Sequence, residues 1–468
     1  MKVLTCSLFC LLIFGRLIAA FVHPIVISNK YFTDSVTQKP FFLKGLDYQP
    51  GGSGAINLKE DPLSNPDKCL RDIVLMQDLG VNTIRVYSVN PDLDHNKCMT
   101  LLAKAGIYLV LDVNSPLPGQ HLNRYEPWTT YSSDYLEHVF KVVDVFSRYN
   151  NTLAFFSGNE IVNDKKSARN SPPYIKQLIS DMKQYMKKNS PRIVPVGYSA
   201  ADDLRFRIPL SKYLACEDKN YPLGSVDFYG VNTYQWCGHQ TFKTSGYDKL
   251  TEAYKEFTKP VFFSEFGCNE VTPRQFEEIE SIYSASMFTT FSGGLVYEYS
   301  LEPNKYGLVE INDKNKSITI LEDFKTLKSM YSKVQIPSFE EIKKVQSLTN
   351  PETLKKPNQE QICKTEYENI DISKQPSTTL AKEFIDHGVD LNHTPNFVKL
   401  ELGNMNRSDY TIYDVGGKKI YLDNNQFKFI EKVDISDVSS YEPKEDDKTR
   451  QKNKRLVLLL PLLIITKS

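Results

Sequence analysis

The chain has 468 residues, 41% of them hydrophobic, which is enough for one large domain with a sizeable core and additional segments. Its 57 basic and 57 acidic residues give a formal net charge of zero and mix along most of the sequence. This balance gives no electrostatic reason to expect nucleic acid as a partner, and we predict none.

The N-terminus has the features of a secretory signal. Lys2 precedes an apolar stretch at 3–14, and small residues end the segment at Ala20. We expect residues 1–20 to be a signal peptide that is cleaved after Ala20. Arg16 interrupts the apolar part, and a buried N-terminal helix or a membrane anchor is the alternative interpretation.

Eight apolar runs with the composition of buried strands follow this segment. They are, in chain order, FFLKGLDYQ (41–49), NTIRVYSV (82–89), IYLVLDV (107–113), TLAFFSGNE (152–160), RIVPVGYSA (192–200), VDFYGVNTY (226–234), KPVFFSEFG (259–267) and GGLVYEYS (293–300). Amphipathic stretches lie between them, most clearly at 133–149 and 172–189, where apolar residues recur every three to four positions.

This alternation predicts an α/β fold, a (β/α)8 TIM barrel at residues 21–335 with a small C-terminal appendage. Each amphipathic stretch can cover the outer face of a parallel sheet whose strands are apolar on both sides. A doubly wound open sheet is the alternative. In a barrel, active-site groups stand at the C-terminal ends of the strands.

Past residue 330 the alternation fades. The stretch SFEEIKKVQSL (338–348) predicts one helix, and FVKLEL (397–402) and KKIYLD (418–423) predict short strands. Residues 336–455 are therefore expected to form an appendage and a polar linker rather than a second enzyme. For the polar part, 370–455, a disordered stalk is the simplest interpretation.

The last residues, 456–468, form an apolar tail. Only about ten apolar residues run together, too few for an ordinary spanning helix. A short apolar end on a secreted chain predicts a GPI-attachment signal. The preceding residues, 446–455, are basic and offer no small-residue triplet at the proper distance, so a weak membrane anchor or a tail without function is the alternative.

Removal of residues 1–20 leaves an even number of cysteines for an oxidising compartment, which predicts three disulfides among fifteen possible pairings. No pair has CxxC spacing, so we predict no zinc site. The six cysteines are Cys69, Cys98, Cys216, Cys237, Cys268 and Cys363. Four N-glycosylation sequons, which fit secretion, start at Asn150, Asn315, Asn392 and Asn406.

Two glutamates close apolar strands, where a charge is otherwise unfavourable. The fourth run ends in SGNE at Glu160, and the seventh continues through SEFG, which contains Glu265. Strands four and seven lie roughly opposite each other in such a barrel, and retaining glycoside chemistry needs two carboxyls about 5 to 5.5 Å apart, one protonated and one ionised. Each glutamate alone would be a solvated loop residue or a salt-bridge partner; together they define a candidate site, with Asn159 placed to hold a sugar hydroxyl.

Other chemistries lack their residues. The sequence has no HExxH, GxSxG, P-loop or GxGxxG motif, and its seven histidines show no ligand spacing. We therefore expect no metal and no cofactor. Several of the 27 tyrosines stand at strand ends, where they could stack on sugar rings or simply pack the rim.

These residues carry a resemblance to a known family. SGNE and FFSEFGCN, together with FFLKGLDYQPGG, DPLSNPDKCLRDI and IRVYSVNPDLDHNKCM, resemble glycoside hydrolase family 72, the fungal Gas-type β-1,3-glucanosyltransferases. The resemblance covers roughly residues 22–365. It implies that Glu160 is the acid/base and Glu265 the nucleophile. The residues it implies at the donor sites are Tyr48, Gln49, Tyr87, Asp112, Asn159, Tyr234 and Tyr297.

The resemblance also implies the disulfides Cys69–Cys98, Cys216–Cys363 and Cys237–Cys268. The last would brace the loop after Glu265, where Gly267 lets the chain turn. Some family members carry a C-terminal cysteine-rich module, but this chain has no cysteine after Cys363. It therefore resembles the subgroup that lacks this module.

The activity that the resemblance implies is internal cleavage of a β-1,3-glucan and transfer of the new reducing end to the non-reducing end of another chain. The expected partners are glucan donor and acceptor chains, and the expected state is a monomer at the cell surface, GPI-anchored to plasma membrane or cell wall. A β-glucan endohydrolase and a catalytically silent glucan-binding wall protein are the alternatives.

Overall fold

The computed structural model describes residues 22–349, 361–376, 380–400 and 409–420, all within one compact unit. The predicted signal peptide, the apolar tail and the sequon at Asn406 lie outside the described residues. Among those described, no helix has the length and the apolar composition needed to cross a bilayer.

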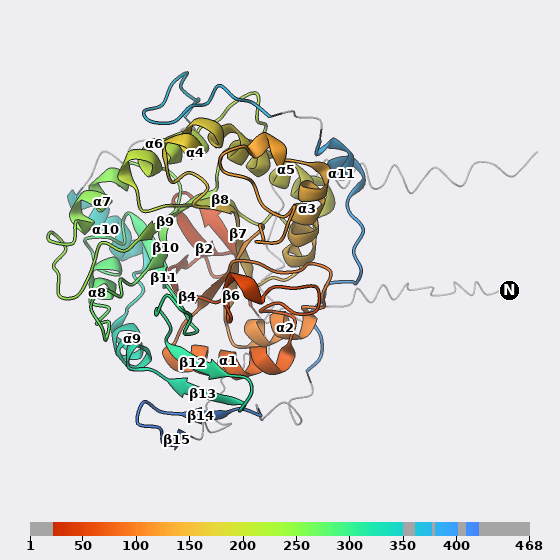
Figure 1. Ribbon diagram of the computed structural model, residues 1–468. Helices are drawn as coiled ribbons and strands as arrows, with labels where there is room; N and C mark the ends of the chain where they lie inside the picture. The colour runs from red at the N-terminus through yellow and green to blue at the C-terminus, as the bar shows by residue number, and fades with distance from the viewer. Residues whose placement is uncertain (1–21, 350–360, 377–379, 401–408, 421–468) are drawn as a thin grey trace, which may run out of the picture. The chain divides into compact units, whose positions relative to one another are not determined.

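Eight parallel strands close into a barrel, which confirms the predicted fold (Figure 1). The order around the barrel is β10-β11-β4-β5-β6-β7-β8-β9, so neighbours in sequence are neighbours in space. Every strand overlaps one of the eight predicted runs. The strands are β4 (Leu43–Asp47), β5 (Thr83–Val86), β6 (Tyr108–Asp112), β7 (Thr152–Asn159), β8 (Val196–Ala200), β9 (Phe228–Thr233), β10 (Val261–Phe266) and β11 (Phe291–Val296).

Helices surround the barrel and cover the outer faces of its strands (Figure 1). The predicted stretch 172–189 is the longest of them, α5, and its inward face is buried against the barrel. The helices are α1 (Pro66–Leu79), α2 (Asn96–Lys104), α3 (Ser133–Ser147), α4 (Lys165–Asn170), α5 (Pro172–Asn189), α6 (Leu204–Ala215), α7 (Tyr247–Tyr254), α8 (Glu278–Ile282) and α9 (Glu322–Lys333), with short 3₁₀ turns at Ser53–Ala55 and Pro127–Thr129.

A small antiparallel sheet closes the N-terminal end of the barrel. It consists of β1 (Ile25–Ser28), β2 (Tyr31–Asp34) and β3 (Pro40–Phe41). The ring of Phe32 packs at 5.7 Å from Phe228 and 5.9 Å from Phe262, two residues at the starts of their strands. The opposite end, where the strands finish, is thereby left for the loops that carry functional groups.

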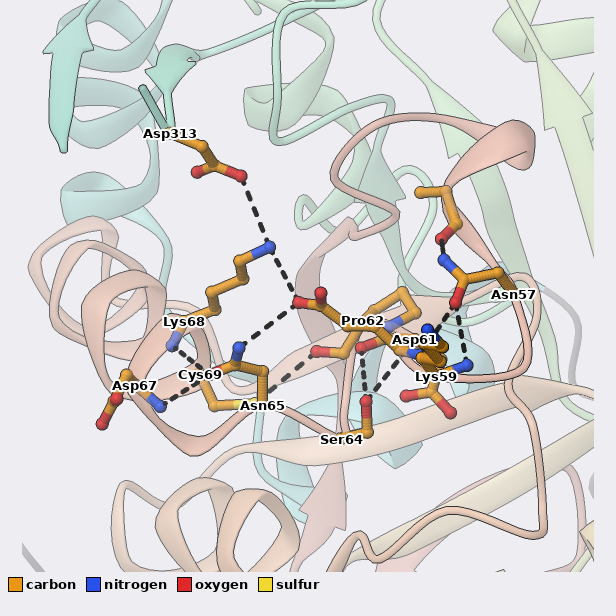
Figure 2. Close-up of polar contacts among 12 residues, drawn as sticks. Asn57, Lys59, Asp61, Pro62, Ser64, Asn65, Asp67, Lys68, Cys69 and Asp313 are labelled. Atoms are coloured by element: carbon orange, nitrogen blue, oxygen red, sulfur yellow. Dashed lines mark hydrogen bonds and ion pairs between the residues drawn. The ribbon is translucent and has the colours of Figure 1, made fainter. Parts of the chain in front are cut away.

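Side chains fix the loop that joins β4 to α1 (Figure 2). Asn65 caps the helix, because its Oδ1 accepts hydrogen bonds from the backbone N–H groups of Asp67 (3.2 Å) and Lys68 (3.3 Å). Lys68 reaches across to Asp313, which follows β12 (Val309–Asn312), at 3.3 Å. The first loop of the barrel is thus tied to a segment about 240 residues further along the chain.

The segment after the barrel packs against it. The predicted helix at 338–348 is confirmed as α10 (Phe339–Thr349). A four-stranded sheet combines β12 (Val309–Asn312) and β13 (Ser317–Ile320) with β14 (Thr411–Tyr413) and β15 (Lys419–Ile420), and β15 lies in the run predicted at 418–423. No strand forms at 397–400, the described part of the run predicted at 397–402.

A disordered stalk was the wrong interpretation for the described residues between 370 and 420. Helix α11 (Lys382–His387) lies on α5, and the ring of its Phe384 packs 5.9 Å from Phe140 on α3. The backbone N–H of Val398 donates to Thr100 Oγ1 at 3.0 Å. Figure 1 shows this segment along the outside of the ring of helices. Its apolar residues are too sparse for a periodic pattern, although some pack against the barrel, such as Phe397, whose ring lies 5.6 Å from that of Tyr149.

Three disulfides join Cys69 to Cys98, Cys216 to Cys363 and Cys237 to Cys268. These are the pairs that the resemblance implied. The first links α1 to α2, the second ties the segment after the barrel to the end of α6, and the third links the loops that follow β9 and β10.

Loss of the Cys216–Cys363 bond is expected to destabilise the protein. Its partners are 147 residues apart, so the bond restricts a large loop of the unfolded chain, and the double substitution Cys216→Ala/Cys363→Ala should lower the free energy of unfolding by about 2–4 kcal/mol. Denaturant unfolding monitored by circular dichroism would measure this. The Cys69→Ala/Cys98→Ala pair, separated by 29 residues, is the control and should lose less; equal unfolding midpoints for wild type and the Cys216/Cys363 variant would contradict the prediction.

Candidate active site

Glu160, just after β7, and Glu265, on β10, stand at the C-terminal end of the barrel and line one cavity of about 640 Å³. Glu160 follows the last residue of β7 with a left-handed backbone (φ 49°) and donates its N–H to Ser199 O at 2.9 Å. The cavity is lined by Gln49, Gly51, Gly52, Gly54, Tyr87, Asn159, Glu160, Glu265, Tyr297, Glu298, Glu302, Pro303 and Asn304.

The carboxylate of Glu265 is held by three donors. Its Oε1 accepts hydrogen bonds from the Tyr87 hydroxyl (2.9 Å) and from Arg85 Nη1 (3.2 Å), and its Oε2 accepts one from the Tyr234 hydroxyl (2.7 Å). The side chain is buried, with 7% of its surface exposed. Donors on both oxygens fix the orientation of the carboxylate before any ligand arrives.

Opposing effects act on the pKa of Glu265. Burial raises this pKa above the usual carboxyl range, and repulsion from Glu160 adds to the increase. The Arg85 guanidinium and the hydroxyls of Tyr234 and Tyr87 act in the opposite direction, because they stabilise the charged form. Arg85 therefore favours the ionised form of Glu265 although this side chain is buried.

Arg85 is a functional residue that the sequence analysis did not single out. It is fully buried, and its Nε and Nη2 donate to the two oxygens of Asp112 at 3.0 and 2.9 Å. A further bond from Nη1 reaches Ser264 O at 3.1 Å. Asp112, one of the expected donor-site residues, thus orients Arg85 with both oxygens. The signal in the sequence was an arginine in the middle of an apolar strand.

Glu160 has a different environment. It is only partly buried, and its Oε1 accepts a hydrogen bond from Asn232 Nδ2 at 2.7 Å. The same Nδ2 lies 3.2 Å from Asn159 Oδ1, while Asn232 Oδ1 accepts from Ser264 Oγ at 2.8 Å. Asn232, on β9, was not expected from the sequence. One carboxyl thus sits beside a cation and the other beside a neutral amide.

Of the two residues expected near the end of the first strand, Gln49 lines the cavity and Tyr48 does not. Tyr48 is 2% exposed, does not line the cavity, and donates its hydroxyl to Asp72 Oδ2 at 2.7 Å. Gln49 lines the cavity, and its Oε1 accepts the backbone N–H groups of Tyr87 (3.2 Å) and Ser88 (3.3 Å). The alternation of side chains along a strand turns two neighbours to opposite faces.

Four tyrosine rings form an aromatic cluster beside the two carboxyls. Tyr297 lies 6.4 Å from Tyr87, 6.3 Å from Tyr234 and 5.2 Å from Tyr306, measured between ring centroids. Tyr306 was not expected from the sequence, since it lies ten residues beyond the last barrel strand. Such rings offer faces for sugar rings and hydroxyls for their substituents.

The loop after β10 has the turn expected at Gly267, and the described sequon asparagines differ in exposure. Gly267 has φ 110°, a conformation that favours glycine, and Cys268 follows in its disulfide. Of the described sequons, Asn315 and Asn392 are exposed and Asn150 is partly buried.

Metal ligation finds no support in the part of the chain that the structure describes. One group of side chains there has ligand spacing, Cys237, Cys268 and Glu270. The two cysteines are joined in a disulfide and offer no thiolate to a metal.

The sequence matches the family described as "Glucanosyltransferase", glycoside hydrolase family 72, over residues 16–335. It is 58% identical over 370 residues to "1,3-beta-glucanosyltransferase GAS4" of Saccharomyces cerevisiae, covering 79% of this chain and 76% of that protein. It is 42% identical over 409 residues to "1,3-beta-glucanosyltransferase gel2" of Aspergillus fumigatus, covering 86% and 82%. Among solved structures, Saccharomyces cerevisiae Gas2p in complex with laminaripentaose is similar with a TM-score of 0.67 at 37% identity, covering 76% and 77%.

Proposed function

Because the chain belongs to the glucanosyltransferase family, glycoside hydrolase family 72, we propose that it is a retaining 1,3-β-glucanosyltransferase. It cleaves a β-1,3-glucan internally and transfers the new reducing end to the non-reducing end of another glucan chain. The observation that carries this proposal is Glu265, a buried carboxylate held by three donors in the same cavity as Glu160. The relatives' names and the laminaripentaose complex of Gas2p support β-1,3-glucan as the substrate.

In the first step, an oxygen of Glu265 attacks the anomeric carbon, and the bond from this carbon to the glycosidic oxygen breaks. Glu160 gives its proton to the departing oxygen, which leaves as the hydroxyl of the released chain. In the second step, Glu160 takes the proton of an acceptor hydroxyl, whose oxygen attacks the anomeric carbon and releases Glu265. Two inversions retain the β configuration.

The neighbouring residues fit these roles. Arg85, Tyr87 and Tyr234 orient Glu265 for attack and hold its charge. Asn232 positions Glu160. Gln49, Asn159 and Tyr297 line the cavity and are proposed to contact the sugar. Tyr48 and Asp112, which bond to Asp72 and Arg85 respectively, are proposed to position other side chains instead.

The cellular setting is proposed from the sequence. A signal peptide at 1–20 and a GPI-attachment signal at 456–468 would place a glycosylated monomer at the cell surface, in the plasma membrane or the cell wall. Three disulfides fit an oxidising compartment of this kind.

The experiment that tests the activity uses the purified secreted form and a reduced β-1,3-glucan oligosaccharide, with products resolved by chain length over time. We expect products longer than the starting material, because an acceptor sugar competes with water for the glycosyl-enzyme. Only shorter products would establish a β-glucan endohydrolase instead. An unchanged substrate would favour a catalytically silent glucan-binding protein.

The hydroxyl of Tyr234 is expected to matter for the rate. Tyr234→Phe removes one of the three donors to Glu265, and a hydrogen bond to a charged group contributes about 1.5–3 kcal/mol, so kcat/KM for transfer should fall roughly 10- to 100-fold. Steady-state kinetics on the same oligosaccharide would measure this. Tyr306→Phe, in the same cluster but without a bond to Glu265, is the matched control; equal values for both variants would contradict the role of the Tyr234 hydroxyl.

A further inference from the structure

A third carboxyl lines the cavity beside the two proposed catalytic glutamates. Glu298 lies two residues after the end of β11, between Tyr297 and Tyr299. It borders the same cavity as Glu160 and Glu265, yet only 3% of its surface is exposed. The mechanism above gives it no part. A carboxyl kept in a buried place that faces a substrate cavity calls for a functional reason.

Glu298 is held in place by its surroundings. Its Oε1 accepts a hydrogen bond from Asn304 Nδ2 at 2.7 Å, and the same Nδ2 lies 3.1 Å from the Tyr297 hydroxyl. Its backbone N–H donates to Tyr306 O at 3.2 Å. The guanidinium of Arg274 donates to the carbonyl oxygens of Tyr297 and Tyr306. The side chain is therefore part of a fixed wall and not a mobile surface acid.

The charges around Glu298 are mostly negative. Glu302 on the same loop and Glu265 on β10 repel its charged form, and burial disfavours that form further. The buried Asp47 on β4 also interacts electrostatically with Glu298. Among the described residues, no lysine or arginine forms an ion pair with Glu298; Arg274 is paired with Asp323.

These surroundings raise the pKa of Glu298 to about 7. Burial is the main cause, with repulsion from Glu302 and Glu265, while the hydrogen bonds from Asn304 and Tyr297 act against the increase. The carboxyl is thus protonated in mildly acid solution, where it can donate a hydrogen bond as well as accept one.

We propose that Glu298 is a further substrate-binding residue of this site, whose protonated carboxyl donates a hydrogen bond to a hydroxyl of the glucan chain in the cavity. This inference rests on the proposed function, since it needs a glucan there. Below about pH 7 the donor is present; above it, the group becomes a carboxylate that can only accept and that adds a negative charge near Glu265. Glucan binding therefore weakens as the pH rises through 7.

Glu302 provides a matched comparison on the same wall. It lines the cavity and carries the same group, but its Oε1 accepts the backbone N–H of Gly51 and the Ser300 hydroxyl, both at 2.8 Å. Both partners are donors on one oxygen, and Gly51 itself lies on the wall of the cavity. The role of Glu302 is to tie the loop of Gly51 and Gly52 to the end of β11.

The test measures binding in a protein whose turnover is strongly slowed. In the Glu160→Gln background, calorimetry with a laminari-oligosaccharide should show Kd rising roughly three- to tenfold between pH 5.5 and pH 8.5. In Glu160→Gln/Glu298→Gln this rise should be absent, because the amide remains a donor at every pH. Glu160→Gln/Glu302→Gln should keep the rise but at lower pH, because the repulsion from Glu302 that raises the pKa of Glu298 is gone. The same pH dependence with and without Glu298 would overturn the inference.

A second variant guards against a folding artefact. Asn304→Asp removes the donor to Glu298 and adds a carboxyl beside it, so the rise in Kd should move to higher pH, and an unchanged midpoint would count against the proposal. Thermal unfolding checks that each variant is folded. Transfer products from the wild-type enzyme together with a flat pH dependence of Kd would overturn this inference alone. Absence of glucan binding at any pH would overturn the proposed function and this inference with it.

Discussion

Glu265→Gln is expected to lower the rate of glucan transfer by at least about 10⁴-fold, because removal of an enzyme's nucleophile lowers kcat by several orders of magnitude. The amide cannot form the covalent intermediate, although it keeps the size of the side chain and leaves the donors Tyr87, Tyr234 and Arg85 in place. Product analysis with the reduced oligosaccharide measures the loss. Glu310→Gln, an exposed acid on β12, is the control and should retain full activity.

Glu160→Gln separates the two roles. Loss of a general acid/base lowers rates about 10²- to 10⁴-fold, but a substrate whose leaving group needs no proton escapes this loss in the first step. An aryl β-glucoside oligomer with an acidic phenol should therefore release its phenol far faster in Glu160→Gln than in Glu265→Gln. Equal phenol release by the two variants would contradict the assignment of acid/base and nucleophile.

The second large effect is expected at Arg85. Arg85→Met leaves Asp112 and Glu265 buried without their cation, and breaking a buried ion pair in this way lowers the free energy of unfolding by about 3–5 kcal/mol. Arg205→Met is the control, because Arg205 forms a surface pair with Asp203 and is 66% exposed; pairs of this kind contribute about 0–1 kcal/mol. Urea unfolding of both variants gives the comparison.

The pH profile of Arg85→Met carries independent information. The guanidinium lowers the pKa of Glu265, so its removal raises this pKa, and the nucleophile stays protonated to a higher pH. Because attack requires the ionised form, the acid limb of kcat/KM should move to higher pH. Asp112→Asn in the Arg85→Met protein should recover part of the lost stability. An acid limb at the wild-type position would show that Arg85 acts on the fold alone.

The sequence by itself determined the barrel and its two glutamates. Each of the eight apolar runs contains a strand of the closed barrel. Such strands can be predicted from their own residues, because a strand that is buried on both faces is apolar along nearly its whole length. Helix α5 has the predicted bounds 172–189 for the same local reason. Glu160 and Glu265 could be found because the end of a strand is recognised from local sequence. In this fold the C-terminal ends of all eight strands lie on the same side of the barrel, where active sites form.

Only the tertiary structure decided which side chains act on those glutamates. Arg85 reaches Glu265 across 180 positions of sequence, and Asn232 reaches Glu160 across 72; no local pattern encodes such pairs. Tyr48 turned away from the cavity because its hydroxyl bonds to Asp72, and Glu298 turned toward it. Partners distant in sequence meet only when the barrel closes, so their contacts follow from packing and not from periodicity.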